Sequence, residues 1–364
     1  MRIAFFGLRE FSDYHHISGF QSFLRRIANE LIKKGIQVDY ILYNSGLIRQ
    51  EEPETNLKIK YYNSFQDAFK SLSCSSYDHI INIRLSRFDR VRLPLYKRLF
   101  LPDSHYHYLA FVWPDSSFKR HIVFGESLVL SRKGKIVTVS PRLFRALRQL
   151  SNNVYYLLPP VPRDYFLEPD EKPNNEKIKI LYLGVLYPDK GIEDVLEVFK
   201  YFSSDPKFEL LICAIYEPRN KKSVEMRHWL KNQTTLKYIE VDRYNYSPET
   251  ENMAGRLLKE ADIMIQPYRN ISATVDTPIL LLEAMASLCA VITTPIGSIP
   301  EIYGSSDFLI DTRDGIASII SFLKKVSYVD ILEERQRIFN INRQLEYESG
   351  KVAENFIKII SGAL

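Results

Sequence analysis

The sequence predicts an α/β protein of two domains, each built on a doubly wound parallel sheet. Its 364 residues exceed the size at which one hydrophobic core usually stops growing. Short apolar runs alternate with amphipathic stretches in both halves of the chain, which favours parallel strands joined by helices. Residues 161–177, rich in Pro, Asn and charge, separate the two series and are typical of a domain linker.

The first domain is expected over residues 1–160. An apolar run at residues 2–6 predicts its opening strand, and an apolar stripe predicts a helix over residues 19–34. The members of the stripe are Phe20, Leu24, Ile27 and Leu31. Further strands are expected at residues 38–43, 78–83, 108–113 and 135–139. Ser140 and Pro141 then predict a helix start, as N-cap and first helical residue.

The second domain is expected over residues 178–345. Strands are predicted at residues 179–183, 208–215, 262–266 and 290–294, and helices at residues 192–202, 278–287 and 315–325. Residues 346–364 contain a last helix, at 349–360, which we expect to pack back on the first domain. Two such domains would face a central cleft at the carboxyl ends of their strands, where ligands bind.

The composition, 45% hydrophobic and 26% charged, is that of a globular protein. Three widely spaced cysteines, Cys74, Cys213 and Cys289, lack the spacing of a disulfide framework or a zinc site and favour a reducing compartment. No secretory signal pattern opens the chain, and no run of about 18 apolar residues occurs. We therefore expect a cytoplasmic protein that does not span a membrane.

Charge is distributed unevenly along the chain. Residues 1–160 hold 24 Lys and Arg against 13 Asp and Glu, a balance of +11, and the remainder has a balance of −6. Basic residues mixed with apolar ones at residues 84–98, and Arg142, Arg145 and Arg148 on a predicted helix, suit the anionic inner face of the cell membrane or a polyprenyl phosphate acceptor. A face that only meets solvent is the alternative, and no nucleic-acid motif accompanies these residues.

The turn GVLYPDKG, from Gly184 to Gly191, lies between a predicted strand and a predicted helix. Gly184 allows a tight turn or the close approach of a ligand. Lys190 brings a cation close to a helix N-terminus, which suits a diphosphate. A turn with a solvated lysine is the alternative interpretation.

The segment VDTPILLLEAMAS predicts a second anion site. Asp276 or Thr277 is a candidate cap for a helix that begins at Pro278. The amides of Ile279 and Leu280 then lack an intrahelical acceptor. Further along this apolar helix stands Glu283, whose buried carboxylate needs a partner such as two ribose hydroxyls. A glutamate bonded to the backbone is the alternative. The GSIPE loop at residues 297–301 is interpreted as support for this helix.

The segment ISGF precedes the first helix. Gly19 lets a ligand or the facing domain approach the backbone, and His15 and His16 are candidates to act on an acceptor. An ordinary surface loop is the alternative for both histidines.

Several of these segments together resemble glycosyltransferase family four. The match is specific over KILYLGVLYPDKGI and over residues 261–302, where the KG turn, the EAMA helix and the PE loop follow in the family's order and spacing. It is looser over ISGFQSFLRRIANELIKKGIQVDYI and IVTVSPRLFRALRQL. The resemblance implies a GT-B fold and the transfer of a hexose, with retention, from a UDP- or GDP-sugar to a lipid-linked, polysaccharide or other glycan acceptor.

The resemblance also implies roles for the site residues. Lys190 would contact the diphosphate, the amides of Ile279 and Leu280 the distal phosphate, and Glu283 the ribose hydroxyls. Lys190, Glu283 and Asp276 are the catalytic candidates. The family needs no divalent cation or other cofactor, and the sequence contains no DxD metal motif.

Three departures from the family pattern stand out. Val275 occupies the position of the first of two family glutamates, with Asp276 adjacent to it. Val185 replaces an arginine of the KG turn, so that Arg243 or Arg269 would have to supply the missing cation. Where the family often has a histidine, this chain has FVWPD, whose Trp113 and Asp115 are acceptor-side candidates.

These departures keep a second hypothesis open. The chain could be a catalytically weak or inactive nucleotide-sugar-binding partner protein on the same fold. A nicotinamide-dependent enzyme is disfavoured, because the first strand leads into FFGLREF and not into GxGxxG.

Overall fold

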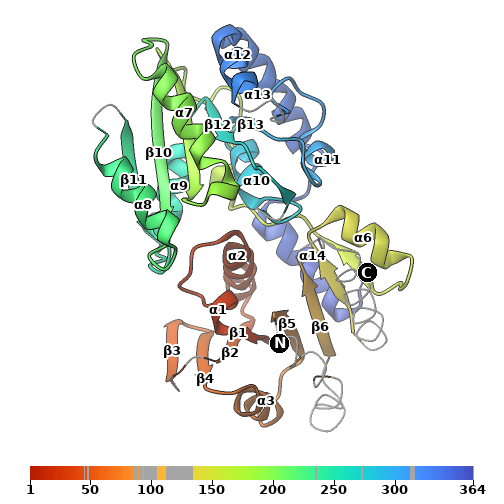
Figure 1. Cartoon of the computed structure of the whole chain (residues 1–364). Helices are drawn as coiled ribbons and strands as arrows, with labels where there is room; N and C mark the ends of the chain where they lie inside the picture. The colour runs from red at the N-terminus through yellow and green to blue at the C-terminus, as the bar shows by residue number, and fades with distance from the viewer. Residues whose placement is uncertain are drawn as a thin grey trace. The chain divides into compact units, whose positions relative to one another are not determined.

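The computed structural model describes residues 1–44, 46, 49–84, 89, 93, 105–111, 134–233, 236–271, 274–311 and 316–363. They form two compact units. The first comprises Met1–Pro160 together with Glu348–Leu364, and the second comprises Val161–Tyr347. Each unit has its own sheet with helices packed against it (Figure 1).

The first unit is built on a sheet with strand order β3-β4-β2-β1-β5-β6-β7-β8. All neighbouring strands are parallel except the edge strand β3, which runs antiparallel to β4. The strands are β1 (Arg2–Leu8), β2 (Gln37–Tyr43), β3 (Arg49–Glu54), β4 (Leu57–Tyr62), β5 (His79–Arg84), β6 (His105–Ala110), β7 (Ile136–Thr138) and β8 (Val154–Tyr156). Its described helices are α1 (Arg9–Ser12), α2 (Gly19–Lys33), α3 (Phe65–Ser73), α6 (Pro141–Arg148) and α14 (Ser349–Ser361).

Helix α2 follows directly from its sequence. The Ser18 side chain accepts a hydrogen bond from the amide of Gln21, and Gly35 takes a positive φ of 75° just beyond the helix. Three members of the predicted stripe are buried: Leu24, Ile27 and Leu31. The last helix of the chain, α14, packs against α2, and Lys34 forms an ion pair with Glu354 at 3.2 Å. The chain therefore returns to its first unit at its end.

Of two predicted elements of this unit, the structure confirms one and shows the other at a different position. The helix predicted from Ser140 and Pro141 is confirmed, with the Ser140 side chain accepting from the Leu143 amide at 3.0 Å. The strand predicted at residues 108–113 lies instead at His105–Ala110. The strand begins earlier than predicted because His105 and His107, which are polar, belong to it. His107 is buried, and its imidazole lies 3.2 Å from that of His79.

The second unit has a wholly parallel sheet with strand order β11-β10-β9-β12-β13. The strands are β9 (Ile178–Val185), β10 (Phe208–Tyr216), β11 (Lys237–Asp242), β12 (Ile263–Gln266) and β13 (Ala290–Thr293). The order reverses between β9 and β12, so the crevice outside their carboxyl ends is the place where doubly wound sheets bind ligands. This edge is formed by the residues that follow Val185 and Gln266.

Helices pack on both faces of this second sheet (Figure 1). They are η1 (Arg163–Tyr165), η2 (Pro188–Lys190), α7 (Ile192–Phe202), α8 (Lys221–Lys231), α9 (Pro248–Glu260), α10 (Ile279–Ala286), α11 (Ile299–Tyr303), α12 (Ala317–Lys325) and α13 (Tyr328–Asn342). Both units therefore have the doubly wound α/β architecture that the sequence predicts.

Residues 161–177 pack on the second unit. Tyr165 is buried and donates a hydrogen bond to the carbonyl of Glu251 at 2.8 Å. The buried ammonium of Lys172 donates to the carbonyls of Leu258 and Ser287, at 2.9 and 2.8 Å. Both carbonyls lie near helix C-termini, where a cation is favoured.

Candidate active site

The turn after β9 is fastened to the loop after β12. Gly191 has a φ of 76°, and a Cβ atom there would lie 2.0 Å from the carbonyl oxygen of Pro267. Only glycine fits such a contact in this backbone conformation. The amide of Arg269 donates to the carbonyl of Asp189 at 3.2 Å. The two loops at the reversal of strand order are therefore held together by backbone contacts.

Lys190 ends the short helix η2 in this turn. Its Nζ lies 5.1 Å from the centre of the Tyr268 ring, within range of a cation–π interaction. Burial, and then the charge of Arg243, lower the pKa of Lys190 to about 8. Among the residues that the structure describes, no carboxylate lies within ion-pair distance of this ammonium group. A cation in this setting favours a bound anion.

Helix α10 is the next helix after β12 in the chain. Its N-cap is Pro278, so the prediction that Asp276 or Thr277 caps the helix was wrong. The carboxylate of Asp276 instead accepts a hydrogen bond from the Ser298 hydroxyl at 2.6 Å, at the start of α11. Proline offers no side-chain acceptor, and the amides of the first turn of a helix have no intrahelical acceptor. The amides of Ile279 and Leu280 are thus placed to bind an anion.

Glu283 lies on α10 between Leu282 and Ala284, which are both fully buried, and is itself only 7% exposed. Burial raises the pKa of Tyr268, and the negative charge of Glu283 adds to that rise. Tyr268 therefore contacts Lys190 and is influenced by the charge of Glu283. The sequence motifs do not single out Tyr268, although its position two residues after the end of β12 was a signal.

Glycine at position 184 occupies the penultimate place of β9, in register with Ala214 of β10. A Cβ atom there would lie 3.2 Å from the Tyr182 hydroxyl and 3.5 Å from the Gln266 side-chain nitrogen. The hydroxyl of Tyr182 donates to the carbonyl of Val185 at 2.9 Å. The absence of a side chain at Gly184 thus keeps this tyrosine in contact with the end of its strand.

The two candidate arginines have different partners. Arg269 forms ion pairs with Glu193 at 2.6 Å and with Asp194 at 2.9 Å, both at the start of α7. Arg243 donates from one nitrogen to Glu217 at 2.9 Å and to the Tyr187 hydroxyl at 2.7 Å. Arg269 therefore forms ion pairs with two carboxylates, whereas Arg243 forms an ion pair with one.

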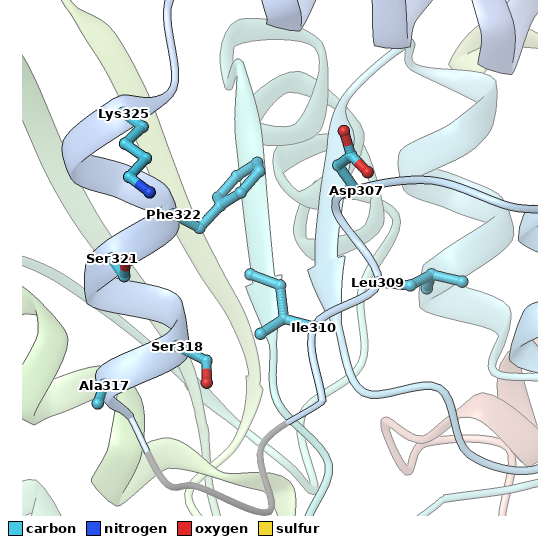
Figure 2. A pocket seen from close by; sticks show the side chains of 8 residues that line it. All are labelled: Asp307, Leu309, Ile310, Ala317, Ser318, Ser321, Phe322 and Lys325. Carbon is cyan, nitrogen blue, oxygen red and sulfur yellow. The ribbon is translucent and has the colours of Figure 1, made fainter.

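A cavity of about 590 Å³ lies elsewhere in the second unit. Figure 2 shows it between α12 and the segment that carries Asp307, Leu309 and Ile310. None of its lining residues is among the predicted donor-site residues. Its size suits a small ligand, but its position does not connect it with Lys190.

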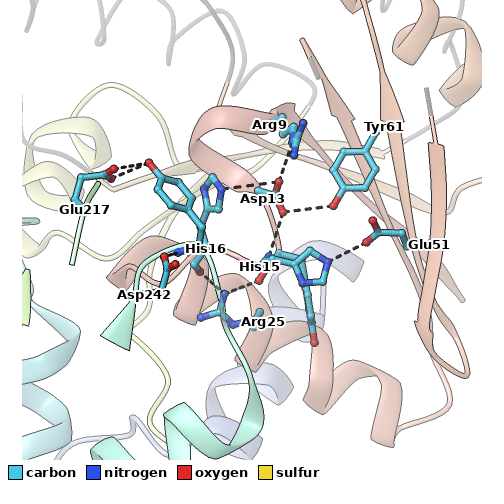
Figure 3. Close-up of polar contacts among 11 residues, drawn as sticks. Arg9, Asp13, His15, His16, Arg25, Glu51, Tyr61, Glu217 and Asp242 are labelled. Atoms are coloured by element: carbon cyan, nitrogen blue, oxygen red, sulfur yellow. Dashed lines mark hydrogen bonds and ion pairs between the residues drawn. The ribbon is translucent and has the colours of Figure 1, made fainter. Parts of the chain in front are cut away.

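The loop between α1 and α2 in the first unit carries both candidate histidines (Figure 3). The His15 side chain contacts Glu51 at 2.9 Å, and that of His16 lies 4.0 Å from the carboxylate of Asp13. Gly19 is the first residue of α2. Each histidine thus has a carboxylate nearby, and only that of His15 is within hydrogen-bond distance.

Asp13 organises this loop. Its carboxylate accepts from Arg9 at 2.8 Å and from the amide of His15 at 3.1 Å. Burial alone would raise the pKa of Asp13, but these hydrogen bonds and the neighbouring positive charges lower it overall. The buried guanidinium of Arg25 donates to the carbonyls of Tyr14 and His16, at 2.7 and 2.6 Å. The acceptor-side candidates Trp113 and Asp115 lie outside the described residues.

On the basic helix α6, Arg148 donates to the carbonyls of Asn152 and Val154. The side chains of the other basic stretch, residues 84–98, lie outside the described part of the chain except for Asp89 and Leu93. In the parts that the structure describes, no helix is long and apolar enough to cross a bilayer. The same parts contain no cluster of three or more residues suited to hold a metal ion.

Known proteins resemble this chain in two ways, in the sequence of one segment and in the fold of the whole chain. Residues 166–343 match the family described as glycosyl transferases, group 1. A search of curated proteins gave no significant match. Two solved structures illustrate the likeness in fold, a sucrose-phosphate synthase from Thermosynechococcus elongatus and Anabaena HepE in complex with UDP and glucose.

The synthase is 14% identical, with a TM-score of 0.69, and the alignment covers 100% of this chain and 99% of the synthase. HepE is 11% identical, with a TM-score of 0.68 and 99% of each chain covered. The TM-scores show likeness of fold, and the segment that matches the family model contains the Lys190 turn and helix α10. The chain has the GT-B fold, and its residues 166–343 are similar to the group 1 glycosyl transferases.

Proposed function

We propose that the protein is a retaining, metal-independent glycosyltransferase of family four. It would transfer a hexose from a UDP- or GDP-sugar to a lipid-linked, polysaccharide or other glycan acceptor. The observation that carries the donor half of this proposal is that the Tyr268 ring lies against the ammonium of Lys190 and is influenced by the charge of Glu283, a residue of α10. HepE, which has this fold, is described in complex with UDP-glucose, and this supports a uridine donor.

In the proposed complex, the Lys190 ammonium and the amides of Ile279 and Leu280 hold the diphosphate. These groups would act most strongly as negative charge grows on the leaving diphosphate, because they are already oriented before the reaction. Glu283, almost fully buried, would accept hydrogen bonds from the ribose hydroxyls.

Calorimetric titration of the full chain with UDP-, GDP- and ADP-sugars, with EDTA present, tests the donor half. We expect one nucleotide to bind, and Lys190→Ala and Glu283→Ala each to abolish or strongly weaken that binding. If both variants bind the donor as the wild type does, the site assignment is wrong.

Transfer itself requires a separate measurement. The valines at positions 185 and 275 stand where family four carries charged residues, and this favours a second candidate, a nucleotide-sugar-binding partner protein without transferase activity. Release of the nucleoside diphosphate at saturating sugar nucleotide, with a set of prenyl phosphate and oligosaccharide acceptors, separates the two. Sustained release with an acceptor supports the enzyme, and tight binding without release supports the partner protein.

For the first unit we propose an acceptor-binding role and peripheral contact with an anionic membrane. The support is the basic charge of residues 1–160 and the three arginines of α6. Flotation with vesicles of anionic phospholipid should show binding that weakens with salt, and vesicles of neutral phospholipid should show none. Binding that does not respond to salt or lipid charge would remove the membrane proposal.

A further inference from the structure

The carboxyl ends of three strands meet in register in the second unit. Ile215 of β10 pairs with Val185 of β9 on one side and with Val241 of β11 on the other. Arg243 follows Val241 by two residues, and its amide donates to the carbonyl of Tyr216 at 3.1 Å. The backbone thus brings Arg243 to the same sheet edge as the turn that contains Val185.

The side chain of Arg243 reaches that turn. One guanidinium nitrogen donates to the hydroxyl of Tyr187 at 2.7 Å, and the guanidinium carbon lies 5.9 Å from the centre of the Tyr187 ring. The carbonyl of Tyr187 in turn accepts from the amide of Lys190 at 2.9 Å. Arg243 therefore rests on the residue that lies between Val185 and Lys190 in the turn.

Glu217 holds the guanidinium in this position. Its carboxylate is 6% exposed, lies 2.9 Å from Arg243, and also accepts from the Tyr244 hydroxyl at 2.7 Å and the Arg219 amide at 3.1 Å. The same nitrogen of Arg243 makes both of its contacts, and within the described residues its other two nitrogens have no hydrogen-bonding partner. Arg243 is thus anchored at one nitrogen and has donors left for a ligand.

Arg243 and Arg269 differ in the formal charge of the groups to which they belong. Lys190 and Arg243 together with Glu217 carry a formal charge of +1, whereas Arg269 with Glu193 and Asp194 carries −1. Burial lowers the pKa of Lys190, and the nearby charge of Arg243 lowers it further, as expected of two cations that share one site. A dianionic ligand would relieve that repulsion.

We infer that Arg243 is the second diphosphate-binding cation of this site and takes the place of the arginine that family four carries where this chain has Val185. This inference rests on the proposed function. Arg243 follows β11, whereas Val185 ends β9. The same positive charge would thus be supplied from another strand of the sheet. The planar fork of Arg243 suits two phosphate oxygens.

Calorimetric titration of the full chain with UDP, GDP and ADP tests the inference on whichever nucleotide binds. We expect Arg243→Gln to weaken binding of that nucleoside diphosphate by about tenfold to a hundredfold. The loss should be smaller for the corresponding monophosphate. The control Arg269→Gln should stay within about twofold of the wild type, because its two carboxylates already neutralise the native side chain.

Two further variants keep the test decisive. Arg243→Gln with Glu217→Gln removes both charges, so no buried carboxylate is left unpaired, and it should show the same loss with an unchanged melting temperature. Adding Val185→Arg to Arg243→Gln should restore part of the affinity. If Arg243→Gln and the double variant bind like the wild type while Lys190→Ala does not, Arg243 has no such role. If Lys190→Ala also binds normally, the proposed donor site itself has failed.

Discussion

The ammonium nitrogen of Lys190 lies 5.1 Å from the centre of the Tyr268 ring, and the same ring is influenced by the charge of Glu283. Tyr268 comes from the loop after β12, Lys190 from the turn after β9 and Glu283 from α10. One aromatic ring thus connects the three elements that meet where the strand order of the second sheet reverses.

Replacement of Tyr268 should therefore weaken donor binding without touching a charged group. We expect Tyr268→Leu to lower affinity for the sugar nucleotide by about 2- to 30-fold, the range of a partly desolvated cation–π interaction. Tyr268→Phe keeps the ring and should stay close to the wild type. Calorimetry on both variants measures this, and equal losses in the two would show that the hydroxyl matters and the ring face does not.

The pKa of Lys190, lowered to about 8, predicts a pH profile for donor binding. The ammonium form is present below that value and is lost as pH rises through it. If only this form binds, affinity should be flat from about pH 6.5 to 7.5 and fall about tenfold for each pH unit above 8. Titrations across this range measure the profile.

Lys190→Arg provides the matched control, because arginine stays charged throughout this range. Its affinity should not fall between pH 8 and 9.5. An identical decline in this variant and the wild type would assign the pH dependence to another group, such as Lys172, whose pKa burial also lowers to about 8.

Much of the fold could be predicted from the sequence because its central strands are continuous apolar runs. Strands β9, β10, β12 and β13 and helix α7 are buried on the faces that the pattern indicates. The edge strand β11, KYIEVD, escaped because five of its six residues are half-buried or exposed, so its sequence is not an apolar run. Helix α13 escaped because it buries charged residues: Arg335 pairs with Asp262, and Glu334 with Arg337. The first pair joins distant segments and the second lies within α13, and neither gives the helix an apolar stripe.

The site could be predicted in part for the same reason. Lys190 and Glu283 each belong to a local motif, and such motifs can be identified from the sequence alone. The choice between Arg243 and Arg269 depends on which carboxylates lie near each one, Glu217 for the first and Glu193 and Asp194 for the second. Those contacts join different strands and loops, and spacing along the chain does not encode them.

Asp276 provides a contrast with these residues, because its carboxylate is engaged with the Ser298 hydroxyl at 2.6 Å and is buried. We expect Asp276→Ala and Ser298→Ala each to destabilise the protein by about 1–3 kcal/mol, as loss of a buried hydrogen bond does. The double variant should be less destabilised than the sum, because both single changes remove one shared contact. Urea unfolding of the four proteins measures this coupling.

If Asp276 is instead catalytic, the two single variants will differ in another way. Donor turnover would then collapse in Asp276→Ala and persist in Ser298→Ala. A structural role requires both variants to retain turnover in proportion to their folded fraction.

Gly191 should be the least replaceable glycine of the donor half. A Cβ atom there would meet the Pro267 carbonyl oxygen at 2.0 Å, and its φ of 76° disfavours any side chain. Gly35 has a nearly equal φ of 75° at the end of α2, but nothing lies within 4 Å of its added Cβ. We expect Gly35→Ala to cost about 1–2 kcal/mol for the left-handed backbone alone, and Gly191→Ala to cost clearly more.

Urea unfolding, followed by probes placed in each unit, measures both costs. Donor binding should fall only in Gly191→Ala, because displacement of Pro267 moves Tyr268 away from Lys190. Equal costs in the two variants, with donor binding intact, would mean that the two loops are not locked together as the backbone contacts indicate.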